Sequence, residues 1–271
     1  MQRPIGVFDS GVGGLTVLRA LRAALPAESF LYLGDTARLP YGTKSEHTVA
    51  RYALQAADEL VERGIKCLVV ACNTASAAAL PALQQRFGEL PVVGVIEPGA
   101  RAACAASHSG RIAVLATEST VRAGAYTRAI ARLRPDAEVR AIACALFVAL
   151  AEEGWTEGAV ARAAAERYLA PLRMAEAAAP DTIVLGCTHF PVLQAVIAAA
   201  AGEHVRIVDS AATSAAQVRS QLAARGLLLP AGAVPAGVRF LATDAVSRFA
   251  AVGGRFLGAP IAADDVELID L

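Results

Sequence analysis

Residues 67–74, CLVVACNT, form an apolar run that ends in a cysteine and two polar residues. Residues 182–189, TIVLGCTH, repeat this order and end in Thr188 and His189. A helix-like stretch follows each of them. Apolar runs of this length without clean alternation are typical of strands buried on both faces of a parallel sheet. The repeat therefore predicts two similar units, each with a cysteine at the end of a buried strand.

Further short apolar runs alternate with longer Ala-, Leu- and Arg-rich segments. One of these segments, Leu15–Leu25, carries apolar residues at helical spacing. Strands and helices that alternate in this way indicate an α/β fold with mostly parallel sheets. The predicted strands are Ile5–Phe8, Phe30–Leu33, Cys67–Ala71, Val92–Ile96, Ile112–Ala116, Val139–Ala143, Thr182–Leu185, Val205–Val208 and Val238–Leu241.

The order of these runs predicts two pseudo-symmetric α/β lobes. The first lobe would contain residues 1–96 and 210–271, with the tail returning to complete it, and the second would contain residues 97–209. Ligands of open α/β sheets bind beyond the carboxyl ends of the strands. If the two lobes face each other, the active site is expected in the cleft between them.

Composition and charge exclude several classes of protein. Hydrophobic residues make up 55% of the 271 residues, which excludes global disorder. The 25 basic and 25 acidic residues cancel, so a nucleic-acid partner is not expected. The most apolar window, residues 141–151, is shorter than the roughly 20 residues of a membrane-spanning helix. The N-terminus has no secretory signal pattern. We therefore expect a cytoplasmic protein without a membrane partner.

The cysteines favour free thiols over a disulfide framework. Their number is odd, they are widely spread, and no C-x-x-C pair occurs. Without further clustered ligands, no metal site is expected. Each thiol is then either a small buried hydrophobe or a reactive group. The five are Cys67, Cys72, Cys104, Cys144 and Cys187.

Two loops after predicted strands could bind a ligand. Asp9-Ser10 and three nearby glycines precede a helix, where backbone N–H groups attract an anion such as a carboxylate. The spacing matches neither common nucleotide-binding motif. The alternative is a plain glycine-rich turn with Asp9 as the helix N-cap. Likewise, Pro40-Tyr41-Gly42 is either part of a binding loop or an ordinary turn.

Two thiols on opposite sides of a small ligand predict a specific chemistry. One thiolate takes a proton from a carbon while the other thiol returns a proton to the opposite face, which inverts that carbon. The ordinary pKa of a thiol, about 8.5, makes both forms accessible after modest tuning. Asp9 could tune Cys72, and His189 could tune Cys187. Otherwise the cysteines are inert packing residues and the histidine a loop or packing residue.

Six motifs together resemble the cofactor-independent aspartate/glutamate racemase family, and within it the glutamate racemases. The five main motifs occur in the family's order, and with the C-terminal motif the resemblance covers essentially the whole chain. They are GVFDSGVGGLTVL (6–18), YLGDTARLPYGTKS (32–45), VVACNTASA (69–77), GVIEPGA (94–100), VLGCTHFPVL (184–193) and VELIDL (266–271).

The resemblance implies two α/β lobes with the active site between them. Cys72 would exchange the proton of D-glutamate and Cys187 that of L-glutamate, with Asp9, His189 and Glu152 assisting. No cofactor is implied, and homodimers are common in the family. The substrate contacts fall on Asp9, Ser10, Pro40, Tyr41, Gly42, Asn73, Thr74, Thr188 and His189.

One segment departs from the family. Where relatives commonly have two prolines after Cys144, this chain has Ala145 and Ala149. We expect the substitutions to loosen the backbone that leads to Glu152 and so to affect the placement of this residue.

The expected function is interconversion of L- and D-glutamate, which supplies D-glutamate for peptidoglycan synthesis. A racemase of a related amino acid such as aspartate is the nearest alternative. A regulatory or binding relative without catalysis, such as one acting on DNA gyrase, belongs to a different class. Racemisation of glutamate without added cofactor would separate the enzyme from both alternatives.

Overall fold

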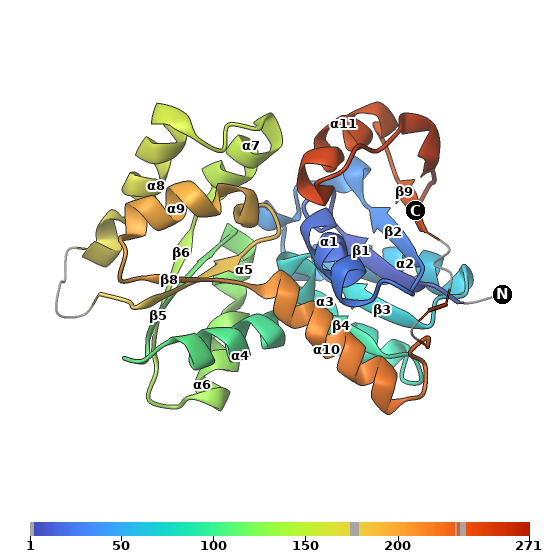
Figure 1. The fold of residues 1–271 in the computed structure, drawn as a ribbon, viewed down its shortest axis with the longest axis horizontal. Helices are drawn as coiled ribbons and strands as arrows, with labels where there is room; N and C mark the ends of the chain where they lie inside the picture. Colours follow the sequence, from blue (N-terminus) through green and yellow to red (C-terminus); the bar gives the residue numbers. More distant parts are fainter. Residues whose placement is uncertain (1–2, 174–178, 231, 234–236) are drawn as a thin grey trace.

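The computed structural model describes residues 3–173, 179–230, 232–233 and 237–271. They form two parallel sheets that lie side by side (Figure 1). The six-stranded sheet has the order β10-β9-β2-β1-β3-β4, and the four-stranded sheet has the order β6-β5-β7-β8. The strands are β1 (Ile5–Asp9), β2 (Phe30–Gly34), β3 (Cys67–Val70), β4 (Val92–Gly94), β5 (Arg111–Ala116), β6 (Glu138–Ala143), β7 (Thr182–Gly186), β8 (Arg206–Asp209), β9 (Val238–Ala242) and β10 (Val266–Leu268).

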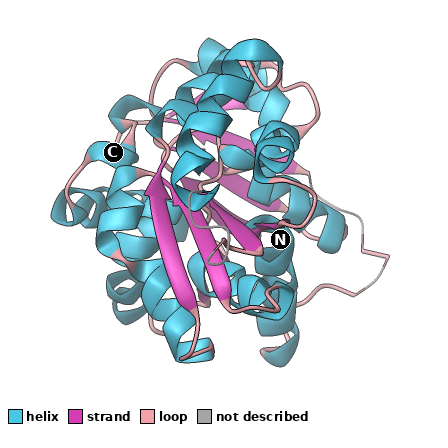
Figure 2. Ribbon diagram, turned by 90° about the vertical axis from the view of Figure 1, so that its left-hand side faces the viewer, coloured by secondary structure: helices cyan, strands magenta, loops and turns pink. Residues whose placement is uncertain are grey.

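Helices connect these strands and cover both sheets (Figure 2). We call each sheet with its helices a lobe, the first lobe having six strands and the second four. The first and last strands of the chain, β1 and β10, both belong to the first lobe (Figure 1). The α-helices are α1 (Leu15–Ala24), α2 (Glu46–Glu62), α3 (Asn73–Arg86), α4 (Ile96–Ala106), α5 (Glu118–Ala123), α6 (Ala125–Leu133), α7 (Ala145–Glu153), α8 (Gly158–Arg173), α9 (Gln194–Ala201), α10 (Ser210–Ala224) and α11 (Val246–Leu257).

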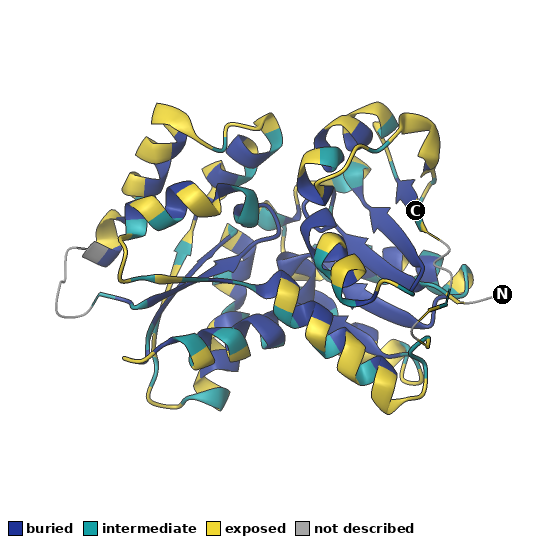
Figure 3. Ribbon diagram, viewed as in Figure 1, coloured by how far each residue is buried: buried dark blue, intermediate teal, exposed yellow. Residues whose placement is uncertain are grey.

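The strands are apolar throughout because both faces of each sheet are covered. In β1, Val7 packs with α1 and α11, whereas the next residue, Phe8, packs with α2 and α3. In β7, Ile183 packs with α8 and α9, and Val184 packs with α4 and α6. The resulting buried layer runs through both lobes, and the outward helix faces are exposed (Figure 3).

The helix α10 joins the lobes, because it packs against α1 of the first and α4 of the second. No helix in the described part of the chain is long and apolar enough to cross a membrane.

The predicted α/β fold with parallel sheets is confirmed, and each predicted strand run overlaps a strand. The largest excess is in Val92–Ile96, which ends as a strand at Gly94, since Ile96 already begins α4; Cys67–Ala71 was too long by one residue, because β3 ends at Val70. The short edge strand β10 was not predicted. The lobe boundaries at residues 96/97 and 209/210 stay predictions.

Candidate active site

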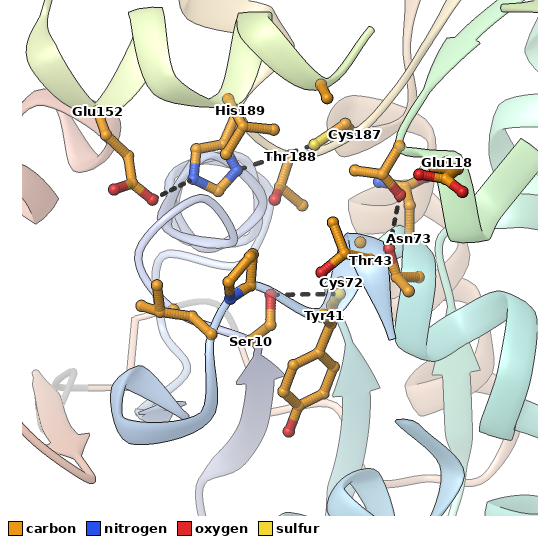
Figure 4. Close-up of a pocket in the computed structure, with 18 of the residues that line it drawn as sticks. Ser10, Tyr41, Thr43, Cys72, Asn73, Glu118, Glu152, Cys187, Thr188 and His189 are labelled. Atoms are coloured by element: carbon orange, nitrogen blue, oxygen red, sulfur yellow. Dashed lines mark hydrogen bonds and ion pairs between the residues drawn. The ribbon is translucent and has the colours of Figure 1, made fainter. Parts of the chain in front are cut away.

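A cavity of about 290 Å³ lies between the lobes, and most predicted site residues line it. Its volume is at the small end of the range for ligand pockets. Figure 4 shows Cys72 and Cys187 in different parts of its wall. Every predicted site residue except Asp9 lines the cavity, together with residues that were not predicted to belong to the site: Gly11, Leu39, Thr43, Thr117, Glu118, Ala145, Val148 and Ala149.

Asp9 lies beneath the glycine-rich loop and is completely buried. Its Oδ2 atom accepts a hydrogen bond from the backbone N–H of Gly11 at 3.0 Å, which shapes the loop. Burial raises the pKa of this carboxyl group. The interpretation of Asp9 as the helix N-cap is wrong, because Gly14 occupies that position of α1. Its role toward the substrate stays a prediction.

Cys72 is the N-cap of α3 and lies two residues beyond the end of β3. The backbone N–H of Ala75 donates to its Sγ atom at 3.4 Å, and the thiol itself donates to Oγ of Ser10 at 3.5 Å. Burial, reinforced by the negative charge of Asp9, raises the pKa of this thiol to about 12. Cys72 is therefore a protonated thiol at neutral pH.

Cys187 follows β7 and faces a charged pair. Its Sγ atom lies 3.8 Å from Nδ1 of His189, and Nε2 of the same ring lies 3.2 Å from Oε1 of Glu152 (Figure 4). Burial opposes a charge on His189, but the hydrogen bonds to Cys187 and Glu152 prevail and raise its pKa to about 10. The hydrogen bond with His189 also lowers the pKa of Glu152. A positively charged imidazolium therefore lies beside the Cys187 sulfur.

The placement of Glu152 is supported from both lobes. It lies in the last turn of α7, which is a regular helix through both alanines of the departing segment. From α11 of the first lobe, Nη2 of Arg248 lies 3.2 Å from its Oε2 atom. Arg255 of the same helix donates to the backbone carbonyl of Glu152 at 2.8 Å. Glu152 therefore reaches His189 in spite of the Pro-to-Ala departures.

Tyr41 contributes its backbone to the cavity wall, because its side chain points away (Figure 4). The ring is buried, and its hydroxyl donates a hydrogen bond to the fully buried carboxylate of Asp35. Thr243 and Arg38 also donate to Asp35, at 2.9 and 2.7 Å. Next along the chain, a Cβ atom on Gly42 would come within 2.7 Å of Cβ of Thr117. This position therefore needs glycine where the loop meets the second lobe.

Three threonine hydroxyls form a triangle where the lobes meet. Oγ1 of Thr74 lies 2.9 Å from that of Thr117 and 3.1 Å from that of Thr120, and the latter two are 3.0 Å apart. Thr74 was predicted, whereas Thr117 and Thr120 were missed. Thr117 directly follows β5, so the strand-end rule would have found it.

The cavity lining contains neither of the two lysines, Lys44 and Lys66, so it offers no amine for a Schiff base. Within the described ranges, no group of three or more His, Cys, Asp and Glu is placed to hold a metal ion.

Comparisons with known proteins identify relatives over the full chain. Residues 5–218 match the family model described as Asp/Glu/hydantoin racemase. The chain is 53% identical to a glutamate racemase of Geobacter metallireducens over 94% of this chain and 93% of the relative. A crystal structure of a glutamate racemase from Bacillus anthracis matches with a TM-score of 0.91 and 38% identity, covering 99% of this chain and 98% of the other. A glutamate racemase from Francisella tularensis in complex with D-glutamate matches with a TM-score of 0.90 and 34% identity, with the same coverage.

Proposed function

Because the chain belongs to the Asp/Glu/hydantoin racemase family, we infer that it interconverts L- and D-glutamate. The relatives named glutamate racemase extend over nearly the whole chain, and one of them was solved with D-glutamate. The observation that carries the mechanism is the pair of cysteines, one beyond a strand of each sheet, in the lining of one cavity. The product D-glutamate serves peptidoglycan synthesis.

In the proposed reaction, the thiolate of Cys187 removes the α-proton of L-glutamate. The Cα–H bond breaks, an S–H bond forms, and the electron pair stays on Cα, where it is delocalised into the α-carboxylate. The thiol of Cys72 then gives its proton to the opposite face of Cα and becomes a thiolate. The product is D-glutamate, and the two sulfurs have exchanged protonation states. The same steps in reverse convert D-glutamate to L-glutamate.

The charges and hydrogen bonds around the two sulfurs support this direction of transfer. Cys72 keeps its proton because its pKa is raised to about 12. His189, held between Cys187 and Glu152, carries positive charge beside the other sulfur. The first backbone N–H groups of α3 and the side chains of Asn73 and Thr74 offer donors for a carboxylate. Fixed donors of this kind stabilise the negative charge that develops in the transition state.

The first experiment follows L-glutamate by proton NMR in D2O with no cofactor added, together with a chiral assay. Loss of the α-proton signal with accumulation of D-glutamate is the expected result. Cys72→Ala and Cys187→Ala should each abolish racemisation, while Cys104→Ala serves as a matched control outside the cavity. A cavity-cysteine variant that racemises glutamate at nearly the wild-type rate would overturn the two-base assignment.

Comparison of rates on glutamate and aspartate tests the nearest alternative. We expect a much larger kcat/KM for glutamate. A preference for aspartate would assign the chain to that substrate, and inactivity on both would favour a binding protein.

The enzyme is further proposed to act in the cytoplasm as a homodimer. A mechanism with two free thiols requires a compartment in which thiols stay reduced. The dimer is suggested by the family resemblance. Light scattering would test it, with twice the chain mass of 27.8 kDa as the expected value and a single-chain mass as the contrary result.

A further inference from the structure

The amide oxygen of Asn73 accepts a hydrogen bond, whereas its amide nitrogen has no hydrogen-bond partner among the described residues. The hydroxyl of Tyr126, which lies on α6 of the second lobe, donates to Oδ1 of Asn73 at 2.7 Å. Nδ2 of Asn73 is buried and has no hydrogen-bond partner among the described residues. The side chain is 3% exposed and lines the cavity. A buried amide nitrogen without a partner is costly and indicates a ligand that supplies an acceptor.

We propose that Tyr126 is a positioning residue that turns the amide of Asn73 so that its N–H group faces a substrate carboxylate. This inference rests on the proposed function, because it concerns the same cavity and the same dicarboxylate substrate.

The direction of the hydrogen bond decides which face of the amide meets the substrate. An asparagine amide can rotate by half a turn, which exchanges its donor and acceptor ends. With the oxygen toward the cavity, a carboxylate would meet another negative atom. Burial raises the pKa of Tyr126, so its hydroxyl keeps its proton and can donate. A donated hydrogen bond holds the amide oxygen away from the cavity and leaves the nitrogen to face it.

The position of Tyr126 makes this orientation dependent on both lobes. Tyr126 is 2% exposed. A Cβ atom added to Gly99 would lie 3.1 Å from the hydroxyl oxygen of Tyr126, so the tyrosine ring has little freedom. Asn73 begins α3 of the first lobe, whereas Tyr126 belongs to the second. The amide is therefore aligned only when the lobes are in this arrangement.

The test is Tyr126→Phe, which removes one hydroxyl and keeps the ring. Binding is measured by calorimetry with D-glutamate in a Cys72→Ser/Cys187→Ser background, so that the ligand is not racemised. We expect Kd to rise about tenfold, the effect of one hydrogen bond. In the active enzyme, KM for either enantiomer should rise similarly while kcat changes by less than about twofold, since bound substrate and transition state lose the same contact.

Three further measurements separate positioning from a structural effect. In a background that carries Asn73→Ala, Tyr126→Phe should not change Kd further, because the amide is already absent. Tyr52→Phe removes a hydroxyl from a tyrosine outside the cavity and should leave Kd unchanged. Thermal melting reports any loss of stability separately.

The possible failures are distinguishable. If the background protein itself does not bind D-glutamate, the proposed function is at fault. If it binds D-glutamate equally well with and without Tyr126→Phe, or if Tyr126→Phe and Asn73→Ala act additively, the positioning role of Tyr126 is wrong.

Discussion

Nε2 of His189 lies 3.2 Å from Oε1 of Glu152, and Nδ1 of the same ring faces Cys187. The imidazole ring is therefore held between a carboxylate and a sulfur, each facing one of its two nitrogens. The other cysteine, Cys72, has only the neutral hydroxyl of Ser10 as a side-chain partner in the described structure. The two sulfurs occupy equivalent places in the fold but have different electrostatic surroundings, and most of the predictions below follow from this difference.

Replacing Glu152 with glutamine should lower the pH at which activity is lost on the alkaline side. The carboxylate helps to raise the pKa of His189 from 6.5 to about 10, so the imidazolium persists to alkaline pH in the wild type. In Glu152→Gln, the imidazolium loses its proton at lower pH. The measurement is kcat/KM from pH 6 to 10, about the range of the shift. Glu153→Gln is the matched control, because Glu153 is exposed and does not line the cavity. An unchanged alkaline limb in Glu152→Gln would contradict the assignment.

The same shift makes folding stability depend on pH. His189 binds its proton more tightly in the folded state than in the unfolded chain. Its contribution to the free energy of unfolding is thus fully present below about pH 6.5 and is lost as pH rises toward 10. Urea unfolding at a series of pH values should show a smaller decline over this range in His189→Asn than in the wild type. Parallel curves for the two proteins would show that the histidine is not stabilised as a cation.

Alkylation should distinguish the two cavity thiols. Only the thiolate reacts, and the raised pKa of Cys72, about 12, keeps that thiol protonated, whereas Cys187 lies 3.8 Å from Nδ1 of the positively charged His189. Limited iodoacetamide treatment at about pH 7–8, followed by peptide mass spectrometry, should label Cys187 several-fold faster than Cys72. Glutamate should protect both. Equal labelling would indicate that the two sulfurs are electrostatically alike.

Gly13→Ala should impair catalysis by displacing His189. An added Cβ atom would lie 2.5 Å from Nδ1 of His189, well inside van der Waals contact. Misplacement of a catalytic group by about 1 Å can cost roughly a hundredfold in rate, so we expect kcat to fall by about that factor. Gly88→Ala is the control, since its Cβ would meet nothing within 4 Å. A Gly13→Ala enzyme with normal kcat would mean that the histidine can move without consequence.

Lys66 and Glu28 form a buried ion pair far from the chemistry, with Nζ and Oε2 2.6 Å apart. Glu28 also accepts from the backbone N–H of Leu229 at 2.9 Å, and Lys66 donates to the carbonyl of Leu227 at 2.8 Å. Lys66→Met leaves the buried carboxylate of Glu28 without its ion-pair partner. It should lower the free energy of unfolding, measured in urea, by about 3–5 kcal/mol. Lys66→Met/Glu28→Leu should recover part of this loss, and kcat should stay unchanged in both. A single variant as stable as the wild type would contradict this.

The fold was predictable because strands covered on both sides are apolar without interruption, as in Ile183 and Val184. The short strand β10 was missed because only Val266 of its three residues is buried. Residues directly after strands, such as Cys72 and Cys187, could be found from the same pattern. Tyr126 could not, because it lies on a helix, matches no motif and forms its hydrogen bond with a side chain of the other lobe.

Apolar cavity residues were unpredictable for a related reason. Val148 and Ala149 line the cavity from one face of α7, and nothing in their spacing distinguishes this face from one that packs in the core. Arg248 reaches Glu152 from a segment nearly a hundred residues away in the sequence. Contacts of this kind depend on how the lobes meet, which local sequence patterns do not describe.

The unlike partners of the two sulfurs make the state of the proposed enzyme depend on its previous turnover. In the proposed two-base reaction, each turnover leaves one cysteine protonated and the other not, and which one depends on the enantiomer that has just been released. The resting enzyme therefore exists in two forms that are covalently identical except for the position of a proton. Because His189 and Ser10 are not equivalent, the two forms differ in free energy. When substrate is abundant, the next turnover competes with the return of the two forms to equilibrium through solvent. The protonation state of the two cysteines then still reflects which enantiomer was released last.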